Sequence, residues 1–502
     1  MPRALLSALA VLALSSAAVP DARPKPADRK FNSTAIDALI AAFQPRFLDP
    51  DLGQIFANAL PNTLDTTVVT ASANDTFIVT GDITAMWLRD STNQVLPYMA
   101  FAAQDAALRD MLHGVVLRQC RSVLIDTYAN AFNIDANGAG HQDDQRTPKM
   151  TPAVFEGEGE RQRASACAAR SARSPQTPHA PRNPLTHLAT PFIPAAKGKF
   201  ETDSLAAVLK SSYAYFNATS DASLLAEPAW LGAMETILDT LVLQQQSTKE
   251  DGAHPAYAFG RAGEVYPNPA APAARCGLSK CGFRPSDDET GLPFLVSANA
   301  MASVELAHLA AMAAAGSGPR LAAIGARAGA LAAQLRAAVE ATARQAVAGA
   351  GTIYAYEVDG FGNFSVADDS NVPSLLSLPY LGYTSRTDPT YLATRALLLS
   401  PRNPFYYVGS VAAGIGSPHT PKNYIWPMAL AMQALTATED AEIAQCLVYI
   451  TRAAAATGFM HESFDKDDAA RFTRPWFAWA NALLGQLVLQ LAQERPHLIF
   501  KP

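Results

Sequence analysis

Residues 296–348 read VSANAMASVELAHLAAMAAAGSGPRLAAIGARAGALAAQLRAAVEATARQAVA and decide the fold class. Apolar residues recur at helical spacing over 296–314 and again over 320–348. Both segments are hydrophobic on more than one face, which is typical of helices buried against two neighbours. The stretch therefore predicts adjacent helices in a layered ring.

The same spacing recurs along most of the chain, between long polar loops rich in Gly and Pro. Strand signals are few: a hairpin of 66–70 with 76–80, and a short strand at 353–358. We therefore predict an all-α fold with about twelve helices. Besides the two above and a short one near Pro373, they are expected at 35–43, 93–108, 110–124, 203–216, 225–246, 390–399, 424–437, 441–457 and 475–495.

Composition argues against several partners. The 502-residue chain is 49% hydrophobic, with a formal net charge of −6. A nucleic-acid surface normally needs a concentrated basic patch, so no nucleic-acid partner is expected. Charged residues interrupt the Ala-rich stretch 321–348, and no segment after the N-terminus is long and apolar enough to cross a membrane. We expect a soluble monomer acting on a neutral substrate.

The N-terminus has the three parts of a secretory signal peptide: the basic Met1-Pro2-Arg3, an apolar run over 4–14 and small residues over 15–18. The alternative, a membrane anchor, is disfavoured because the run is short. Residues 1–18 are therefore predicted to be a signal peptide, and the protein to be a secreted or secretory-pathway glycoprotein. Four glycosylation sequons agree with this, at Asn32, Asn74, Asn217 and Asn363.

Segment 158–198 differs from the rest of the chain. It is rich in Pro, Ala, Ser and Arg and has almost no apolar periodicity, which predicts a disordered insertion. A translated intron is the alternative, because removing the segment would join VFEG (154–157) to KFETD (199–203) in a compact loop. The remainder, 35–502, is predicted to be one catalytic domain.

Cysteine usage favours neither a disulfide scaffold nor a metal centre. Of the five cysteines, Cys276 and Cys281 are close enough in sequence for a local bridge. There is no paired CxxC and no HExxH, so a zinc site is not expected. We predict no metal and no cofactor.

Polar motifs gather between the helices and mix Asp, Asn, Arg and His with Trp and Tyr. Sugar hydroxyls need such donors and acceptors, sugar C–H faces stack on aromatics, and glycoside hydrolysis needs two carboxyl groups. Six clusters stand out: TGDITAMWLRDS (80–91), YANAFN (128–133), FRPSDD (283–288), YEVDGFGN (356–363) with DDSN (368–371), GIGSPHT (414–420) and GFMHES (458–463).

Each motif also has a structural interpretation. Asp90, Asp203 and Asp288 could be helix N-caps. Arg89 could simply pair with Asp90. The remaining candidates, which could all be core residues, are His419, His461, Trp476 and Trp479. Chemistry alone indicates only a carbohydrate-active helical protein.

The motifs carry a closer resemblance. In this order, TGDITAMWLRDSTNQV, YANAFN, GFRPSDD, YEVDGFGN with NVPSLL, GIGSPHT, YIWP and FMHESF resemble glycoside hydrolase family 125, particularly its fungal secreted branch. The resemblance runs from about Asp65 to Phe500, without 158–198. It implies an inverting exo-α-1,6-mannosidase on an (α/α)₆ toroid, with no metal and with a mannose-containing oligosaccharide as substrate.

The resemblance also implies residue roles. Asp287, the first aspartate of RPSDD, would be the general acid and Glu462, in HES, the general base; Asp288 is the alternative acid. Inversion predicts the two carboxyls roughly 6.5–9.5 Å apart, with a water between them. Residues expected to bind substrate are Trp87, Arg89, Asp90, Asn133, Asp203, Arg284, Asp288, Asp359, His419 and His461.

Three other functions remain open at this point. Another toroid hydrolase, such as an α-glucosidase or trehalase, would share the fold. A catalytically inactive mannose-binding or cell-wall protein would not need both Asp287 and Glu462. A phosphorolytic enzyme would need a basic phosphate pocket where Glu462 stands.

Overall fold

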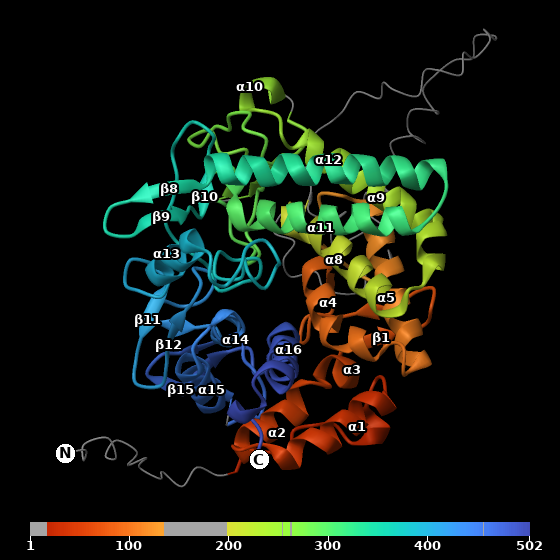
Figure 1. Cartoon of the computed structure of the whole chain (residues 1–502), viewed down its shortest axis with the longest axis vertical. Helices are drawn as coiled ribbons and strands as arrows, with labels where there is room; N and C mark the ends of the chain where they lie inside the picture. Colours follow the sequence, from red (N-terminus) through yellow and green to blue (C-terminus); the bar gives the residue numbers. More distant parts are fainter. Residues whose placement is uncertain (1–17, 135–197, 254, 262–263, 455) are drawn as a thin grey trace.

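The computed structural model describes residues 18–134, 198–253, 255–261, 264–454 and 456–502. Helices dominate this part of the chain, as predicted, and short antiparallel ladders link them (Figure 1). Residues 1–17 of the predicted signal peptide and 158–197 of the predicted insertion lie outside the described residues.

Five helices and one irregular segment form an inner ring. The helices are α4 (Leu88–Val95), α8 (Thr202–Thr219), α11 (Val296–Ala315), α14 (Pro427–Thr436) and α16 (Ala478–Glu494). In the ring, α16 packs against α14 and α4, α4 against α8, and α8 against α11. Segment 368–383 contacts α11, where Ser297 Oγ donates to Pro373 O at 3.2 Å, and α16, where Tyr380 donates to Gln486 at 2.7 Å.

Six helices surround this ring: α2 (Pro50–Ala59), α5 (Ala106–Ile125), α9 (Pro228–Leu243), α12 (Pro319–Thr342), α13 (Pro389–Leu398) and α15 (Asp440–Ala454). Helix α12 packs along α11, α15 along α14, α2 against α16, and α5 against α8 and α9. The two layers form the predicted (α/α)₆ toroid. Three short helices complete the described set: α1 (Thr34–Phe43), α3 (Asn62–Thr66) and α10 (Thr248–Asp251).

The strands pair locally and form no large sheet among the described residues. The pairs are β1 (Val68–Thr70) with β2 (Phe77–Ile78), β3 (Met86–Trp87) with β4 (Ala131–Phe132), β5 (Phe259–Arg261) with β6 (Glu264–Tyr266), β7 (Phe294–Leu295) with β10 (Glu357–Val358), β8 (Arg344–Val347) with β9 (Gly351–Tyr354), and β11 (Tyr406–Val408) with β12 (Ala413–Ile415). The remaining ladder joins β13 (Tyr424–Ile425), β14 (Ser463–Asp465) and β15 (Asp468–Thr473).

The five inner helices have no side-chain N-cap, whereas three of the outer helices, α2, α5 and α13, are capped by an aspartate. Outer helices such as α5 and α13 begin at Asp105 and Asp388, whose side chains accept a backbone N–H of the first turn. Four of the inner helices begin directly after Trp87, Leu295, Trp426 or Phe477, none of which caps with its side chain. Bulky residues therefore stand at the N-terminal ends of the inner ring.

Several local predictions were wrong. Segment 368–383 forms turns and not the short helix expected near Pro373. The strand expected at 353–358 is divided between β9 and β10. The helix expected at 93–108 begins at Leu88 and gives way at Leu96 to a 3₁₀ turn. The helix expected to reach residue 348 ends at Thr342, because β8 pairs with β9. Cys276 and Cys281 are not bridged; the Cys281 thiol instead donates to Phe283 O. The hairpin of 66–70 with 76–80 is confirmed as β1 and β2.

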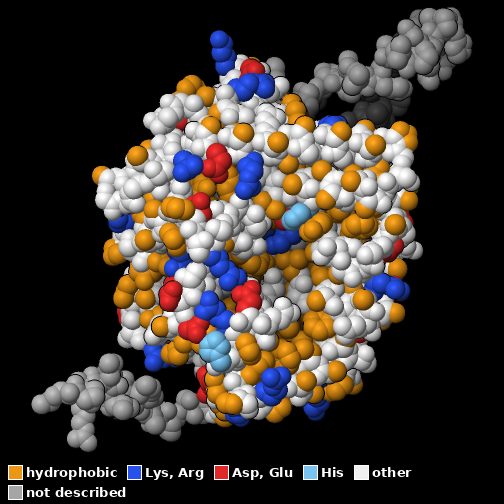
Figure 2. All heavy atoms as spheres, viewed as in Figure 1, with side chains coloured by type: hydrophobic (Ala, Val, Ile, Leu, Met, Phe, Trp, Pro, Cys, Tyr) orange, Lys and Arg blue, Asp and Glu red, His pale blue; other side chains and the backbone are white. Residues whose placement is uncertain are grey.

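Charge on the surface is mixed. On the face in Figure 2, acidic and basic side chains lie interspersed. No helix among the described residues has both the length and the apolar character needed to span a bilayer. The core is apolar and extends through both layers, from Phe56 on α2 to Trp230 on α9 and Leu484 on α16.

Candidate active site

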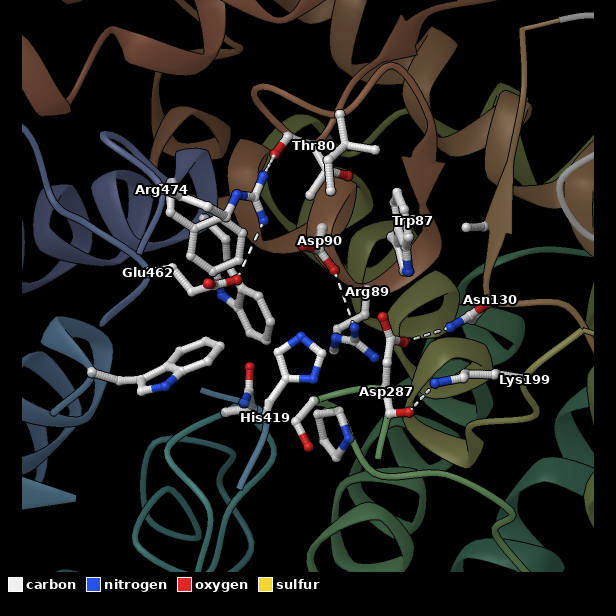
Figure 3. A pocket seen from close by; sticks show the side chains of 18 residues that line it. Thr80, Trp87, Arg89, Asp90, Asn130, Lys199, Asp287, His419, Glu462 and Arg474 are labelled. Carbon is white, nitrogen blue, oxygen red and sulfur yellow. Dashed lines mark hydrogen bonds and ion pairs between the residues drawn. The ribbon is translucent and has the colours of Figure 1, made fainter. Parts of the chain in front are cut away.

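A cavity of about 360 Å³ opens at the N-terminal ends of the inner helices α4, α14 and α16. Figure 3 shows its walls, which carry both carboxylates, such as Asp287 and Glu462, and cations, such as Arg89 and Arg474. The lining residues are Thr80, Ile83, Trp87, Arg89, Asp90, Asn130, Ala131, Lys199, Pro285, Ser286, Asp287, Asn371, His419, Trp426, Glu462, Arg474, Phe477 and Trp479.

Asp287 lies on one wall, in a tight turn before β7. Its φ of +66° is in the left-handed region, where a residue with a side chain is strained and needs support from its surroundings. The support is visible: Asn130 Nδ2 donates to Asp287 Oδ1 at 2.8 Å, and the Lys199 amine donates to the Asp287 carbonyl. The turn thus directs this carboxyl group into the cavity.

The neighbouring Asp288 is placed differently. It is absent from the cavity lining, and its carboxylate accepts from Ser286 Oγ at 3.0 Å. His419 Nδ1 lies 3.6 Å from the other oxygen of Asp288. Burial lowers the pKa of His419, but the contact with Asp288, then the charges of Asp287 and Glu462, raise it to about 9. His419 is therefore a cation at neutral pH, paired with Asp288 at the edge of the site.

Glu462 lies across the cavity from Asp287 (Figure 3). It directly precedes β14, and its Oε1 is 3.5 Å from Arg474 Nη1. The adjacent His461 points away from the cavity: its ring stacks on Phe472 at 3.8 Å and its Nδ1 contacts Arg474 O at 3.2 Å. Packing of His461 thus holds the backbone that presents Glu462.

Arg89 forms the floor of the cavity together with acidic groups. Its guanidinium lies 3.3 Å from both Asp90 and Asp203 and contacts the buried Glu201. Burial, opposed by Arg89, raises the pKa of Asp90 to about 6. Burial likewise raises the pKa of Asp203. The floor therefore offers a fixed guanidinium and carboxyl oxygens to the hydroxyls of a bound sugar.

Aromatic side chains form much of the remaining wall. The Arg89 guanidinium stacks over the Trp479 ring at 5.5 Å. Trp426 Nε1 donates to Thr420 at 2.9 Å, whereas the buried Trp479 Nε1 has no hydrogen-bond partner among the described residues. An indole N–H left in this way inside a polar cavity is available to a ligand oxygen.

Of the predicted site residues, the structure brings Trp87, Arg89, Asp90, Asp287, His419 and Glu462 to the cavity. The others do not line it. Asp203 lies behind Arg89, and Asn133 is buried beyond β4. Arg284 pairs with Glu357 at 2.8 Å, and Asp359 accepts from the backbone N–H groups of Phe361 and Asn363.

Sequence reasoning missed several lining residues. Asn130 lies in YANAFN and Trp426 in YIWP. The resemblance named both strings but did not indicate which of their residues face the cavity. Trp479 was expected in the core; it is 1% exposed, yet it lines the cavity. Arg474 and Lys199 had no signal in the sequence beyond proximity to other motifs.

This arrangement has the groups that acid–base hydrolysis of a glycoside needs. Two carboxyl groups face one cavity from opposite sides, with stacking surfaces and hydroxyl partners between them. In the described part of the chain, no three His, Cys, Asp or Glu side chains are grouped so that they could hold a metal ion. Such a cavity at one end of a double ring of helices defines the class of helical-toroid glycoside hydrolases.

The comparisons narrow the class to a family. The sequence matches the family described as metal-independent alpha-mannosidase, glycoside hydrolase family 125, over residues 49–489, and the chain belongs to it. The Meiotically up-regulated gene 157 protein of Schizosaccharomyces pombe is 36% identical over 96% of this chain and 90% of its own length.

Solved structures are also similar to this chain, and two of them are informative. One is a Streptococcus pneumoniae metal-independent α-mannosidase in a non-productive complex with α-1,6-mannobiose. It is 33% identical, covers 92% of this chain and 99% of its own, and superposes with a TM-score of 0.77. A bacterial glucoamylase complexed with acarbose is 11% identical, covers 88% of this chain and 56% of its own, and has a TM-score of 0.51, which shows a shared fold alone.

Proposed function

We propose that this protein removes terminal α-1,6-linked mannose from the non-reducing ends of glycans, with inversion at the anomeric carbon. The observation that carries the proposal is the placement of Asp287 and Glu462 on opposite walls of one cavity. The α-1,6-mannobiose bound by the Streptococcus pneumoniae relative supports the linkage.

In this mechanism Asp287 protonates the glycosidic oxygen as the bond to the anomeric carbon breaks. Glu462 removes a proton from a water that attacks the same carbon from the other face. One displacement gives a β-configured sugar, and it requires the two carboxyls to be roughly 6.5–9.5 Å apart so that the water fits between them. Arg89, Asp90 and Trp479 are proposed to hold the terminal mannose on the floor of the cavity.

The shape of the cavity supports removal of single terminal sugars. Its floor is closed by buried side chains, Arg89 at 3% exposure and Trp479 at 1%, so a glycan cannot pass through it. Only the end of a chain reaches the bottom of such a site. His419, which is exposed, stands nearer the mouth, where the remainder of the glycan would lie.

Two alternatives lead to different experimental results. Another toroid glycosidase would prefer glucosides, because the axial 2-hydroxyl distinguishes mannose from glucose. A catalytically inactive mannose-binding protein would bind mannobiose without cleaving it. The presence of both Asp287 and Glu462 at one cavity favours a hydrolase, since passive binding needs neither an acid nor a base there.

We also propose that the chain passes through the secretory pathway as a monomeric glycoprotein. The signal-like N-terminus supports this, and all four sequon asparagines, Asn32, Asn74, Asn217 and Asn363, are exposed. Expression in a eukaryotic host, followed by endoglycosidase treatment, should lower the apparent mass. A protein retained in the cytosol with no mass change would contradict the proposal.

Substrate profiling tests the activity. Purified protein in the presence of a chelator should release mannose from α-1,6-mannobiose faster than from the α-1,2 and α-1,3 isomers, and should leave α-glucosides intact. Asp287→Asn is the matched control for a contaminating activity, because general acid–base groups contribute roughly 10²–10⁴-fold. Preference for a glucoside, or equal activity of the variant, would overturn the proposal.

A further inference from the structure

Behind the cavity lies a cluster with more acids than bases. Asp90, Glu201 and Asp203 are buried around the single guanidinium of Arg89, and Asp287 adjoins them at the wall. Buried like charges disfavour one another's ionisation, so such a cluster retains protons at neutral pH. The site chemistry described so far gives no role to Glu201.

One amide bridges Glu201 and Asp287. Asn130 Nδ2 donates to Glu201 Oε1 at 3.0 Å and to Asp287 Oδ1 at 2.8 Å. The two carboxyl groups therefore lie close together. Two carboxylates held this close disfavour each other's ionisation, so the pair retains one shared proton.

The rest of the surroundings fix which partner holds that proton in the empty site. Burial raises the pKa of Glu201 well above its usual range, against the opposing charge of Arg89. Burial also raises the pKa of Asp287, but the charge of Lys199, the hydrogen bond with Glu201 and the charges of Arg89 and His419 lower it overall. The resting proton therefore sits on Glu201.

Glu201 cannot act on substrate itself. It is 1% exposed and does not line the cavity, whereas Asp287 does. Its other oxygen, Oε2, accepts from Arg89 and from Ser204 Oγ at 2.7 Å, which holds the carboxyl group in place against Asp287.

We propose that Glu201 is a positioning residue that holds the proton which Asp287 delivers to the leaving oxygen. The inference rests on the proposed function. The proton moves from Glu201 to Asp287, and Asp287 gives it to the glycosidic oxygen as the bond to carbon breaks. Glu462 gains one proton from the attacking water. After the products leave, that proton returns through solvent to the Glu201–Asp287 pair, so protons balance over one turnover.

The test compares substrates that differ in their need for an acid. Mannobiose needs a protonated leaving oxygen, whereas a 2,4-dinitrophenyl α-mannoside does not. Glu201→Gln should lower kcat on mannobiose about 100-fold and leave the aryl mannoside much less affected. The alkaline limb of the kcat/KM profile on mannobiose should move at least about one pH unit lower, because Asp287 loses its shared proton.

Controls separate this role from packing. Ser211→Ala removes a buried hydroxyl of α8, the helix that begins directly after Glu201. This hydroxyl donates to Gln119 Oε1 at 2.6 Å and does not contact Glu201, so the variant should leave the alkaline limb in place. Glu201→Asp withdraws the carboxyl by one methylene and should shift the limb in the same direction as Glu201→Gln. Equal losses on both substrates with an unmoved limb would overturn the proposal.

A spectroscopic readout is independent of turnover. In the infrared difference spectrum at neutral pH, Glu201→Gln should remove the C=O stretch of one protonated carboxylic acid. An unchanged carboxylic-acid signal would overturn the shared proton. If the wild type cleaves no α-mannoside at all, the proposed function fails, and the spectrum still decides whether Glu201 holds a proton against Asp287.

Discussion

Arg474 Nη1 lies 3.5 Å from Glu462 Oε1, so the candidate base is paired with a cation from a different segment of the chain. The same guanidinium donates to Asp82 through Nε at 2.8 Å and to Thr80 O through Nη2 at 3.0 Å. Arg474 therefore joins the base to the loop that carries Ile83, which also lines the cavity.

Replacing Arg474 should impair catalysis more than folding. We expect Arg474→Gln to lower kcat about 10–100-fold, because Glu462 loses the cation that orients it and the loop loses its attachment. Arg471→Gln is the matched control, since Arg471 is exposed and 3.5 Å from Asp465, outside the cavity. Steady-state kinetics on mannobiose check this; equal activities of the two variants would contradict a role for Arg474.

The unpartnered Trp479 indole N–H should bind a substrate hydroxyl. Trp479→Phe keeps most of the ring but removes the donor, and we expect kcat/KM to fall about 3–10-fold, the value of one neutral hydrogen bond. Trp230→Phe is the control: Trp230 is on the outer helix α9, does not line the cavity, and donates its N–H to Ser212 Oγ on the inner helix α8 at 3.1 Å. That variant should lower Tm and leave kcat/KM unchanged. An unaltered kcat/KM for Trp479→Phe would remove it from the substrate contacts.

Stability should depend on Asp368. This carboxyl is buried, and burial raises its pKa to about 8 although it accepts backbone N–H groups from Leu375 and Leu376 at 2.9 Å each. An unfolded aspartate has a pKa of about 3.9, so the folded group binds more protons between about pH 4 and pH 8. Its contribution to stability is therefore complete below about pH 4 and is lost as pH rises through about 8.

Asp368→Asn removes this titration. The Tm of the variant relative to wild type should rise steadily from pH 4 to pH 8, as measured by thermal melts at several pH values. Asp49→Asn, at an exposed helix cap, checks for a general effect of removing a carboxylate. A Tm difference that does not vary with pH would mean that Asp368 is ionised throughout.

Hydrophobic periodicity predicted the helical layers but not the start of α4. All eight residues of α4 are buried, and six of them are polar, from Arg89 to Gln94. Arg89 and Asp90 line the cavity, and other polar side chains of α4 bond neighbouring backbone. Thr92 donates to Ala207 O at 3.0 Å, and Gln94 donates to Val79 O at 3.0 Å. A pattern read from apolar residues cannot find a helix that the fold buries for its polar groups.

Periodicity also could not show which asparagine of YANAFN reaches the cavity: Asn133 was predicted, but Asn130 lines it. Both stand in YANAFN, around the short strand β4, and residues three apart in an extended chain point to opposite faces. Only pairing of β4 with β3 decides which face meets the cavity, and that pairing is a tertiary contact. Asp287 and Glu462, by contrast, lie in long motifs whose family resemblance predicted both residues for the site, and both line the cavity.

The central claim is that Asp287 and Glu462 act together in one inverting displacement. The most direct test is proton NMR of the first sugar released from α-1,6-mannobiose, with wild type and with Glu462→Gln. The account predicts that wild type releases β-mannose first, before mutarotation, and that the variant releases none at a comparable rate. Initial α-mannose, or undiminished release by the variant, would contradict it.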